Sequence, residues 1–317
     1  MKEDLYCVID IGGTKILLLL MDDAENILFR EKRATPKPEE PDAIIRVISE
    51  LLAEANRKIG YRPEKKPKAI GVCIAAFLDH RKGLIYQSPN LHWNETIPFA
   101  QITSEQLNCP VFIENDANAA VVGEVFYGAA RGHRNAVYVT ISTGIGGGLF
   151  LDGKLFRGHS GFAGEIGHIK PFGKGRTCNC GGDDCLEIWA SGTGISLSAE
   201  TLWSADEISP AKLDAKWVFE EAEKGNTLAQ KIVDQTMEIT GRGLANLVNL
   251  FNPSCIVIGG GVAGNRKKYF TGISKVIREE AIKPSVEITP LEIVPAQLEP
   301  DAGLWGMYAI LTSRLEE

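Results

Sequence analysis

Three cysteines and a histidine lie close together in one stretch of the sequence. Cys178, Cys180 and Cys185 fall within eight residues, and His168 precedes the first of them by ten positions. Three thiolates and an imidazole are the donor set of a closed tetrahedral zinc site. The loop at residues 171–184 is rich in glycine and poor in apolar side chains, so we expect little besides a metal to order it. The pattern predicts a structural Zn²⁺ with no open position for catalysis.

Two alternatives to this metal site are unliganded cysteines and a zinc ribbon that binds nucleic acid or protein. The ribbon is disfavoured because the sequence has no second cysteine pair and the loop is not strongly basic. Acids flank the cluster instead: Glu165 precedes His168 by three positions and Glu187 follows Cys185 by two. A metal that orders the loop would position both carboxylates, which accept hydrogen bonds from sugar hydroxyls.

A further acid stands where a strand is expected to pass into a helix. Residues 113–120 read Ile-Glu-Asn-Asp-Ala-Asn-Ala-Ala, so Asp116 is suited to cap the N-terminus of the helix. It is equally suited to act as general base toward a sugar hydroxyl while Asn115 binds a neighbouring hydroxyl. The two roles are compatible, and the sequence leaves both open.

Three glycine-rich turns each follow an apolar segment. Glycines let the backbone approach phosphate oxygens, and a carboxylate beside such a turn is well placed to orient hydrated Mg²⁺ for phosphoryl transfer. Each turn alone is also explained by a hairpin with chance glycines. The residues expected to serve a nucleotide are Asp10, Gly12, Gly13, Thr14 and Lys15 in the first turn, Thr143 and Gly144 in the second, and Gly260 and Gly261 in the third.

The first turn does not fit the two commonest nucleotide-binding patterns. A dinucleotide-binding unit would begin a helix after the turn, whereas Lys15 to Met21 is β-like, and the turn lacks the Gly-x-Gly-x-x-Gly spacing. The Walker spacing that ends in Gly-Lys-Ser/Thr is absent as well. We therefore expect a nucleotide site built from strand hairpins on two similar domains.

The elements that must position these residues follow from the apolar patterns, which predict a mixed α/β chain. Three strands, a helix, a strand and a second helix indicate a mixed sheet covered by helices. The second glycine turn repeats the strand, turn, strand opening of the chain, which indicates an internal duplication of architecture. Predicted strands are 5–10, 15–21, 26–33, 68–75, 111–114, 136–141, 147–151 and 255–258, and predicted helices are 43–59, 116–127, 228–250, 266–281 and 302–315.

The size of the chain indicates two domains, because 317 residues exceed what one hydrophobic core usually supports. The topology places the boundary near residue 120. We expect an N-terminal α/β domain over 1–119, completed by the C-terminal helix at 302–317, and a C-terminal α/β domain over 120–301 that carries the zinc loop.

Composition and charge narrow the class of protein. With 44% hydrophobic and 24% charged residues the chain is typical of globular proteins, and its net charge of −7 gives no attraction to nucleic acid or anionic lipid. The apolar run from Ile16 to Met21 is too short to cross a bilayer. The four remaining cysteines are scattered through apolar segments and do not resemble a disulfide framework. We expect a cytoplasmic protein.

Taken together, these motifs resemble those of the ROK family, named for repressors, unidentified reading frames and kinases, and especially its glucokinase-like members. The resemblance covers nearly the whole chain. It rests on residues 10–15, Ser88-Pro-Asn-Leu with Trp93, 114–118, 143–148, Gly164-Glu-Ile-Gly-His168, Cys178-x-Cys180-Gly with Cys185-Leu-Glu187, and 259–261.

The resemblance implies a two-lobed α/β fold of the actin, Hsp70 and sugar-kinase (ribonuclease H-like) type that binds ATP with Mg²⁺ and a hexose. It implies that Asp116 is the base, that ATP phosphorylates the 6-hydroxyl of glucose, and that the protein is a homodimer or homotetramer. His168 would bind the sugar with one ring nitrogen and zinc with the other. The other implied sugar contacts are Asn90, Asn115, Glu165 and Glu187, and the nucleotide contacts include Asp10, Thr14, Thr143 and Gly144.

The chain departs from the family pattern in two places. Many kinases of the family carry a Pro-Gly pair where this chain has Ala75-Ala76-Phe77-Leu78-Asp79, and a glycine usually stands where Asp184 precedes the last cysteine. We expect the first departure to affect sugar specificity or loop shape and the second to change a local turn without loss of metal.

Other functions compete with a glucokinase. Kinases acting on N-acetylglucosamine, N-acetylmannosamine, mannose or fructose are the nearest, followed by a non-catalytic sugar sensor. A sugar-responsive repressor would need a DNA-binding helix-turn-helix ahead of the first turn at Asp10, where we expect no room for one.

Overall fold

The computed structural model describes residues 4–60, 66–171, 173, 175–203, 213–264, 266–288 and 290–312. The chain divides into two compact units: unit 1 is Met1–Gly128, Lys154–Ala163 and Pro300–Glu317, and unit 2 is Ala129–Gly153 and Gly164–Glu299. The functional domains assigned above to 1–119 with 302–317 and to 120–301 stay a prediction, since compactness alone divides the chain at different residues.

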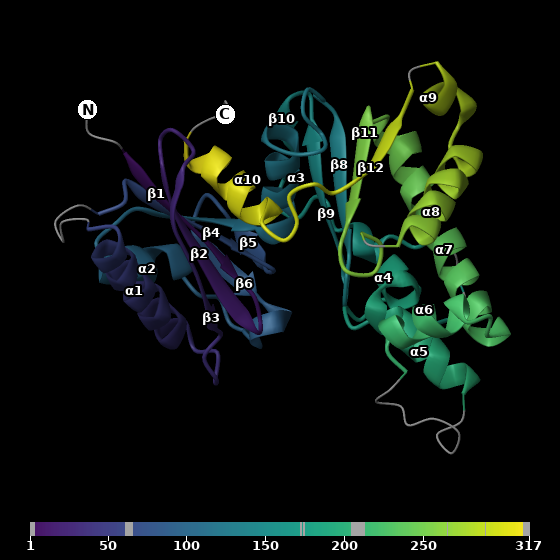
Figure 1. Cartoon of the computed structure of the whole chain (residues 1–317), viewed down its shortest axis with the longest axis horizontal. Helices are drawn as coiled ribbons and strands as arrows, with labels where there is room; N and C mark the ends of the chain where they lie inside the picture. Colours follow the sequence, from purple (N-terminus) through teal and green to yellow (C-terminus); the bar gives the residue numbers. More distant parts are fainter. Residues whose placement is uncertain are drawn as a thin grey trace. The chain divides into compact units, whose positions relative to one another are not determined.

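Unit 1 is built on a five-stranded mixed sheet with the order β3-β2-β1-β4-β7 (Figure 1). The first three strands form an antiparallel meander, whereas β1, β4 and β7 run parallel. The strands are β1 (Leu5–Ile11), β2 (Lys15–Asp22), β3 (Ile27–Ala34), β4 (Ala69–Ile74) and β7 (Val111–Asn115), and the helices are α1 (Pro41–Lys58), α2 (Phe99–Leu107), α3 (Asp116–Phe126) and α10 (Ala302–Leu311).

Both faces of this sheet are covered, which explains the nearly continuous apolar run of β1. On one face Cys7 and Ile9 pack in a core with Ile44 of α1 and Phe99 of α2. On the other face Tyr6 and Val8 pack with residues of α10 that include Leu304 and Met307. Successive residues of β1 therefore serve different cores, as the alternation of side chains along a strand requires.

Unit 2 repeats the sheet topology of unit 1, with the order β10-β9-β8-β11-β12. Here too an antiparallel hairpin stands beside two parallel strands. The prediction of a duplicated architecture is confirmed, as is the mixed α/β class. The strands are β8 (Ala136–Ile141), β9 (Ile145–Leu151), β10 (Lys154–Leu155, at the point where the chain passes to unit 1), β11 (Cys255–Gly259) and β12 (Glu292–Pro295).

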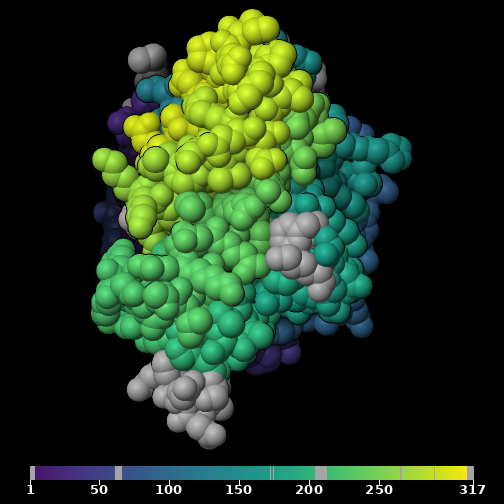
Figure 2. Space-filling model, turned by 90° about the vertical axis from the view of Figure 1, so that its right-hand side faces the viewer, coloured from purple at the N-terminus to yellow at the C-terminus, as the bar shows by residue number. Residues whose placement is uncertain are grey.

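Helices cover the sheet of unit 2, and the longest of them, α7, packs along α8. Gly241 and Gly272 allow this approach, because a Cβ at Gly272 would overlap the side chain of Met237. Figure 2 looks onto this side, where the green and yellow segments of α7 and α8 lie next to each other. The helical elements are η2 (Ile166–His168), α4 (Leu186–Ala190), α5 (Gly192–Leu202), α6 (Ala215–Glu223), α7 (Thr227–Phe251), α8 (Lys267–Glu280) and α9 (Lys283–Glu287).

Most predicted elements occur within one or two residues of their expected bounds. In the second glycine turn, β9 begins at Ile145, two residues before its predicted start, so the glycines that follow lie inside the strand. They are needed there because a Cβ at Gly147 would overlap Ile166 of η2. The last predicted helix, 302–315, ends at Leu311, and its residues 313–315 lie outside the described part of the chain.

Several short elements were not predicted from the sequence. They include the hairpin β5 (Phe77–Asp79) and β6 (Leu84–Gln87), the 3₁₀ turn η1 (Pro89–Leu91), and helices α2, α4, α5, α6 and α9. Within the described residues no helix is both long enough and apolar enough to cross a bilayer.

Candidate functional site

The carboxyl ends of three parallel strands gather polar residues at one edge of the unit 1 sheet. Asp10 of β1 is in register with Cys73 of β4, which is in register with Glu114 of β7. Asn115 ends β7 and Asp116 begins α3. The fold therefore brings Asp10 and Asp116, which are distant in sequence, to the same edge of the sheet. Such an edge is where open α/β sheets usually bind ligands.

The cap of α3 is Asn115, not Asp116. The Asn115 side chain accepts hydrogen bonds from the backbone N–H groups of Ala117 and Asn118, at 3.0 and 3.1 Å. The Asp116 carboxylate accepts a hydrogen bond from the N–H of its neighbour Ala117 at 2.9 Å. The capping interpretation of Asp116 is therefore wrong, and its interpretation as general base stays a prediction.

The carboxyls of Asp10 and Asp116 both hold protons more tightly than usual. Burial, reinforced by the negative charge of Asp116 and then by Asp301, raises the pKa of Asp10 to about 7, and Lys15 only partly opposes this. Burial also raises the pKa of Asp116, against the lowering effect of the Ala117 N–H bond. Buried acids with raised pKa values commonly mark functional sites, where a cation or a substrate restores the charged form.

The first glycine turn is closed by short hydrogen bonds. Gly12 N–H donates to the Lys15 carbonyl at 2.9 Å, and the Thr35 hydroxyl donates to the Gly12 carbonyl at 2.6 Å. A Cβ on Gly13 would lie 2.5 Å from the carbonyl oxygen of Asn90, so only glycine fits there. The turn thus places Asn90, an expected sugar contact on η1, directly beside a residue expected to serve the nucleotide.

The segment that lacks the family's Pro-Gly pair forms the start of the hairpin β5–β6. The Ala76 carbonyl accepts a bond from Asn115 Nδ2 at 3.4 Å, so this segment adjoins the β7–α3 junction. Phe77 packs edge to face on Phe162, with ring centroids 5.8 Å apart, and Tyr86 also packs edge to face with Phe162, with centroids 6.1 Å apart. An aromatic cluster therefore stands where the sequence departs from the family pattern.

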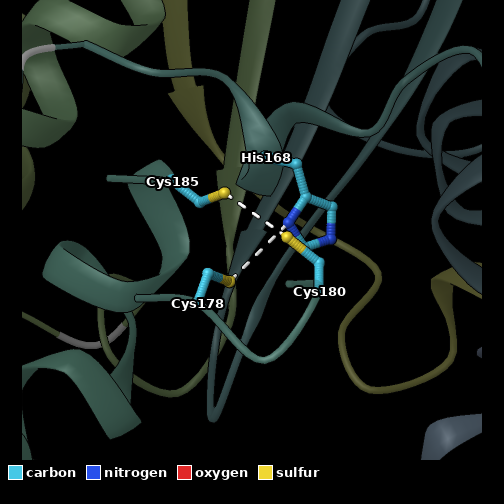
Figure 3. Close-up of side chains that lie close together, drawn as sticks. All are labelled: His168, Cys178, Cys180 and Cys185. Atoms are coloured by element: carbon cyan, nitrogen blue, oxygen red, sulfur yellow. Dashed lines mark hydrogen bonds between the residues drawn. The ribbon is translucent and has the colours of Figure 1, made fainter. Parts of the chain in front are cut away.

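The cysteine and histidine cluster in unit 2 has the geometry of a metal site. The ligand atoms of His168, Cys178, Cys180 and Cys185 all lie within 4.8 Å of one another. Cys180 and Cys185 sulfurs are 3.5 Å apart, and Cys178 sulfur is 4.0 Å from His168 Nδ1. Zinc–sulfur bonds of about 2.3 Å in a tetrahedron imply sulfur separations near ~3.8 Å. Figure 3 shows the four side chains directed toward one another. The residues present fit Zn²⁺.

The metal loop is also held by contacts that need no metal. Asp184, in a left-handed conformation with φ of 57°, accepts bonds from the N–H groups of Gly175 and Arg176 and from Trp189 Nε1. The Arg176 guanidinium stacks 3.9 Å from the Trp189 ring centroid. The expectation that little besides a metal orders this loop is therefore wrong. Asp184 takes the left-handed conformation that a glycine favours and that aspartate tolerates, so the local turn change expected there stays a prediction.

The acids beside the metal cluster are held by different partners. Glu165 Oε2 lies 3.8 Å from His168 Nε2, the ring nitrogen that faces away from the cysteines. Glu187 Oε2 accepts a bond from Ile145 N–H at 2.8 Å. Glu187 therefore reaches the second glycine turn, and a Cβ on Gly144 would lie 2.5 Å from its carboxylate.

A pocket of about 330 Å³ opens beside the same turn, entirely within unit 2. The start of α5 forms one wall, where Gly192 N–H and the Thr193 hydroxyl donate to the carbonyls of Ser142 and Thr143 at 2.7 and 2.9 Å. Two residues predicted from the sequence, Thr143 and Gly261, line the pocket. The other lining residues were not predicted. Ser142 and Val262 adjoin the second and third glycine turns, and the rest lie on α5 or at the start of α6, which have no glycine-turn pattern: Gly192, Thr193, Ser196, Asp214, Ala215 and Lys216.

The third glycine turn is hydrogen-bonded to the carboxylate of Glu299. Gly260, with φ of 91°, donates its N–H to Glu299 Oε1 at 2.6 Å, and the same oxygen accepts a bond from the Tyr138 hydroxyl at 3.2 Å. Gly260 thus provides the positive φ that the turn needs, and its N–H is already hydrogen-bonded to Glu299. Gly261 lines the pocket.

Comparison with known proteins identifies relatives that match nearly the whole chain. The model of the ROK family matches residues 6–314. A glucokinase of Streptomyces coelicolor is 32% identical over 309 residues, which are 94% of each chain. The ROK hexokinase of Thermus thermophilus superposes with a TM-score of 0.83 at 33% identity, covering 98% of this chain and 99% of that one. A ROK glucokinase of Streptomyces griseus in complex with glucose and AMPPNP superposes with a TM-score of 0.78 at 32% identity, covering 96% and 98%.

Proposed function

The chain belongs to the ROK family, and from that membership we propose that this ATP-dependent hexose kinase phosphorylates the 6-hydroxyl of glucose with Asp116 as general base. Its α/β fold is that of the family's sugar kinases, of the actin and Hsp70 type. The observation that carries the proposal is the junction of β7 and α3. There Asn115 supplies the helix cap, and Asp116 lies at the same carboxyl edge of the sheet as Asp10.

In the proposed reaction, the Asp116 carboxylate accepts the proton of the sugar 6-hydroxyl as the oxygen attacks the γ-phosphorus of ATP. The bond between that phosphorus and the bridging oxygen breaks, and ADP leaves with the electron pair. General-base assistance of this kind contributes roughly 10²–10⁴-fold in rate. A buried carboxyl with a raised pKa holds the accepted proton well, provided that it is ionised when the substrate arrives.

The nucleotide residues lie in both units. In unit 1, Asp10, Thr14 and Lys15 surround the first turn, and in unit 2 Thr143 and Gly261 line the pocket. Bound Mg²⁺ would neutralise phosphate charge, and the Asp10 carboxylate suits a hard cation as an oxygen ligand or as an acceptor for its water. The repulsion that Asp10 experiences from Asp116 and Asp301 supports this assignment, because a cation would relieve it.

Sugar binding is assigned to Asn90, Asn115, Glu165, His168 and Glu187, with Zn²⁺ held by His168 and the three cysteines. The geometry of His168 supports a double role, since Nδ1 faces Cys178 and Nε2 faces Glu165. A metal on Nδ1 fixes the imidazole so that Nε2–H donates to a ligand oxygen. The proposed homodimeric or homotetrameric state rests on the family resemblance alone, and the proposed cytoplasmic location rests on the short apolar run and the composition of the sequence.

One experiment tests the base and another the substrate. Asp116→Asn is expected to lower kcat by at least ~10²-fold while glucose binding, measured by calorimetry, stays within about threefold. Asp23→Asn, an exposed aspartate of the same unit, serves as the control. Near-normal turnover of Asp116→Asn would remove the base assignment.

The substrate is tested by steady-state kinetics with ATP over glucose, mannose, fructose, N-acetylglucosamine and N-acetylmannosamine. Glucose is expected to have the highest kcat/KM. A higher value for any other sugar would replace glucose as the substrate and leave the kinase activity itself unaffected.

A further inference from the structure

The residue before Asn115 is a buried carboxylate with three partners. Glu114 is 2% exposed. Its Oε2 accepts a bond from Arg157 Nε at 2.7 Å, and its Oε1 accepts bonds from the Asn115 N–H at 3.0 Å and from Asn118 Nδ2 at 3.1 Å. The Glu114 side chain is therefore hydrogen-bonded to the last peptide of β7 and to the first turn of α3, on both sides of Asp116.

The charge of Glu114 requires Arg157. A carboxylate removed from water costs several kcal/mol unless it is paired, and here the Arg157 guanidinium is the paired cation. Loss of the arginine alone would leave an uncompensated negative charge two residues from Asp116. Glu114 would then turn toward water, and its hydrogen bonds to the β7–α3 junction would be weakened or lost.

Arg157 belongs to a closed loop of unit 1. Its carbonyl accepts the Ala163 N–H at 3.1 Å, and Gly158 and Gly161 take positive φ values of 71° and 93° within the loop. The chain then continues directly into 164–168, the segment of unit 2 that carries Glu165 and His168. The loop that precedes the proposed sugar-binding segment in the sequence is thus bonded, through Arg157, to the strand that leads to the proposed base.

We propose that Arg157 is a positioning residue for phosphoryl transfer: through Glu114 it holds the Asn115–Asp116 segment in the geometry in which Asp116 receives the hydroxyl proton. The inference rests on the proposed function, because it presupposes Asp116 as the base. A displacement of ~1 Å in a catalytic group can cost about 10²-fold in rate, so a lost positioning contact appears mainly in kcat.

The test compares three variants. Arg157→Met is expected to lower kcat about 100-fold with KM for the hexose changed less than about threefold. Adding Glu114→Gln removes the unpaired charge, so the double variant Glu114→Gln/Arg157→Met is expected to regain at least ~10-fold in kcat. Arg157→Lys keeps the positive charge but loses the Nε–H donor. Its kcat is expected to lie between those of the two Arg157→Met variants and that of the parent. Arg134→Met, which removes an arginine that bonds the Asp152 carbonyl in unit 2, is the matched control and should be unchanged.

The results separate the inference from the proposed function. Folded Arg157→Met with kcat within twofold of the parent, or a double variant no faster than Arg157→Met, overturns the positioning role. Should Arg157→Met fail to fold by circular dichroism, Arg157→Lys decides in its place, and a parental kcat there overturns the role. Asp116→Asn is assayed alongside: if it retains turnover, the base assignment fails, whereas its inactivity beside a fully active Arg157→Met removes the positioning role alone.

Discussion

The carboxylate of Glu187 accepts a hydrogen bond from the backbone N–H of Ile145, with 2.8 Å between Oε2 and the nitrogen. Glu187 follows the metal-loop residue Cys185 by two positions, and Ile145 follows the glycine turn at Thr143 and Gly144. One side chain therefore joins the proposed sugar site to the proposed nucleotide site within unit 2.

Two substitutions of Glu187 should separate these roles. Glu187→Gln keeps an oxygen that accepts the Ile145 N–H, so the KM for ATP is expected to change little while the KM for glucose rises about 10-fold from the lost carboxylate. Glu187→Ala removes the acceptor and should raise both KM values. Steady-state kinetics with each substrate varied in turn measures this, and an unchanged ATP KM in Glu187→Ala would show that the turn does not depend on the bond.

Removal of the metal should weaken sugar binding more than it disturbs the fold. The purified protein is expected to contain about one zinc per chain. Chelation, or Cys178→Ser, should raise the KM for glucose at least ~10-fold, because the imidazole of His168 loses its fixed orientation. Far-ultraviolet circular dichroism should stay near that of the parent, since Asp184 and Arg176 hold the loop independently.

Cys109→Ser is the matched control for the metal prediction. The Cys109 thiol lies outside the cluster and donates to the Pro67 carbonyl, a bond that serine can replace. Metal content and glucose KM are expected to match the parent. Full activity of a zinc-free preparation would refute the role assigned to the metal.

The glycine turns and the cysteine spacing were sufficient to predict much of the fold and of the candidate site. The strands around Asp10 are apolar on both faces, and the metal ligands lie within one loop, so local pattern carries the information. The repeat of the sheet order in both units follows from the same signal, because the first and second glycine turns each join two antiparallel strands.

What the sequence could not predict depends on contacts between distant segments. Asn115 and Asp116 are both good capping residues, and only the backbone angles decide that Asn115 is the cap. Arg157 has no local pattern that assigns it to Glu114, 43 positions earlier. The pocket is also lined by residues of α5 and α6, namely Thr193, Ser196 and Lys216. Nothing in the sequence of either helix indicates that it packs beside the second glycine turn.

The raised pKa of Asp10 predicts a pH dependence of stability. In the folded protein its pKa is about 7, against the usual 3.8, so the folded form binds this proton more tightly than the unfolded form. The contribution favours folding below about pH 4 and is lost as pH rises through 7. Asp10→Asn, which stays neutral, should therefore raise the Tm of the nucleotide-free protein clearly at pH 8 and much less at pH 5.

Thermal unfolding at pH 5, 6, 7 and 8 in the absence of nucleotide and divalent cations measures the effect. Asp23→Asn, an exposed aspartate, should give a Tm difference that does not grow with pH. A constant or shrinking difference for Asp10→Asn between pH 5 and 8 would contradict the sign of the shift.

The aromatic cluster of Phe77, Tyr86 and Phe162 should restrict which hexoses the kinase accepts. Phe77 follows Ala76, whose carbonyl accepts a hydrogen bond from the side-chain amide of the proposed sugar contact Asn115. The Phe77 ring packs edge to face on Phe162. Phe77→Ala removes the ring and opens space beside Asn115. Because one pocket group typically changes discrimination by ~10–200-fold, the kcat/KM ratio of glucose to N-acetylglucosamine is expected to fall about 10-fold. Phe112→Ala, an exposed residue of β7, is the control. A ratio that is the same in Phe77→Ala and the parent, with both proteins folded, would assign the departure from the Pro-Gly pattern to loop shape and not to substrate choice.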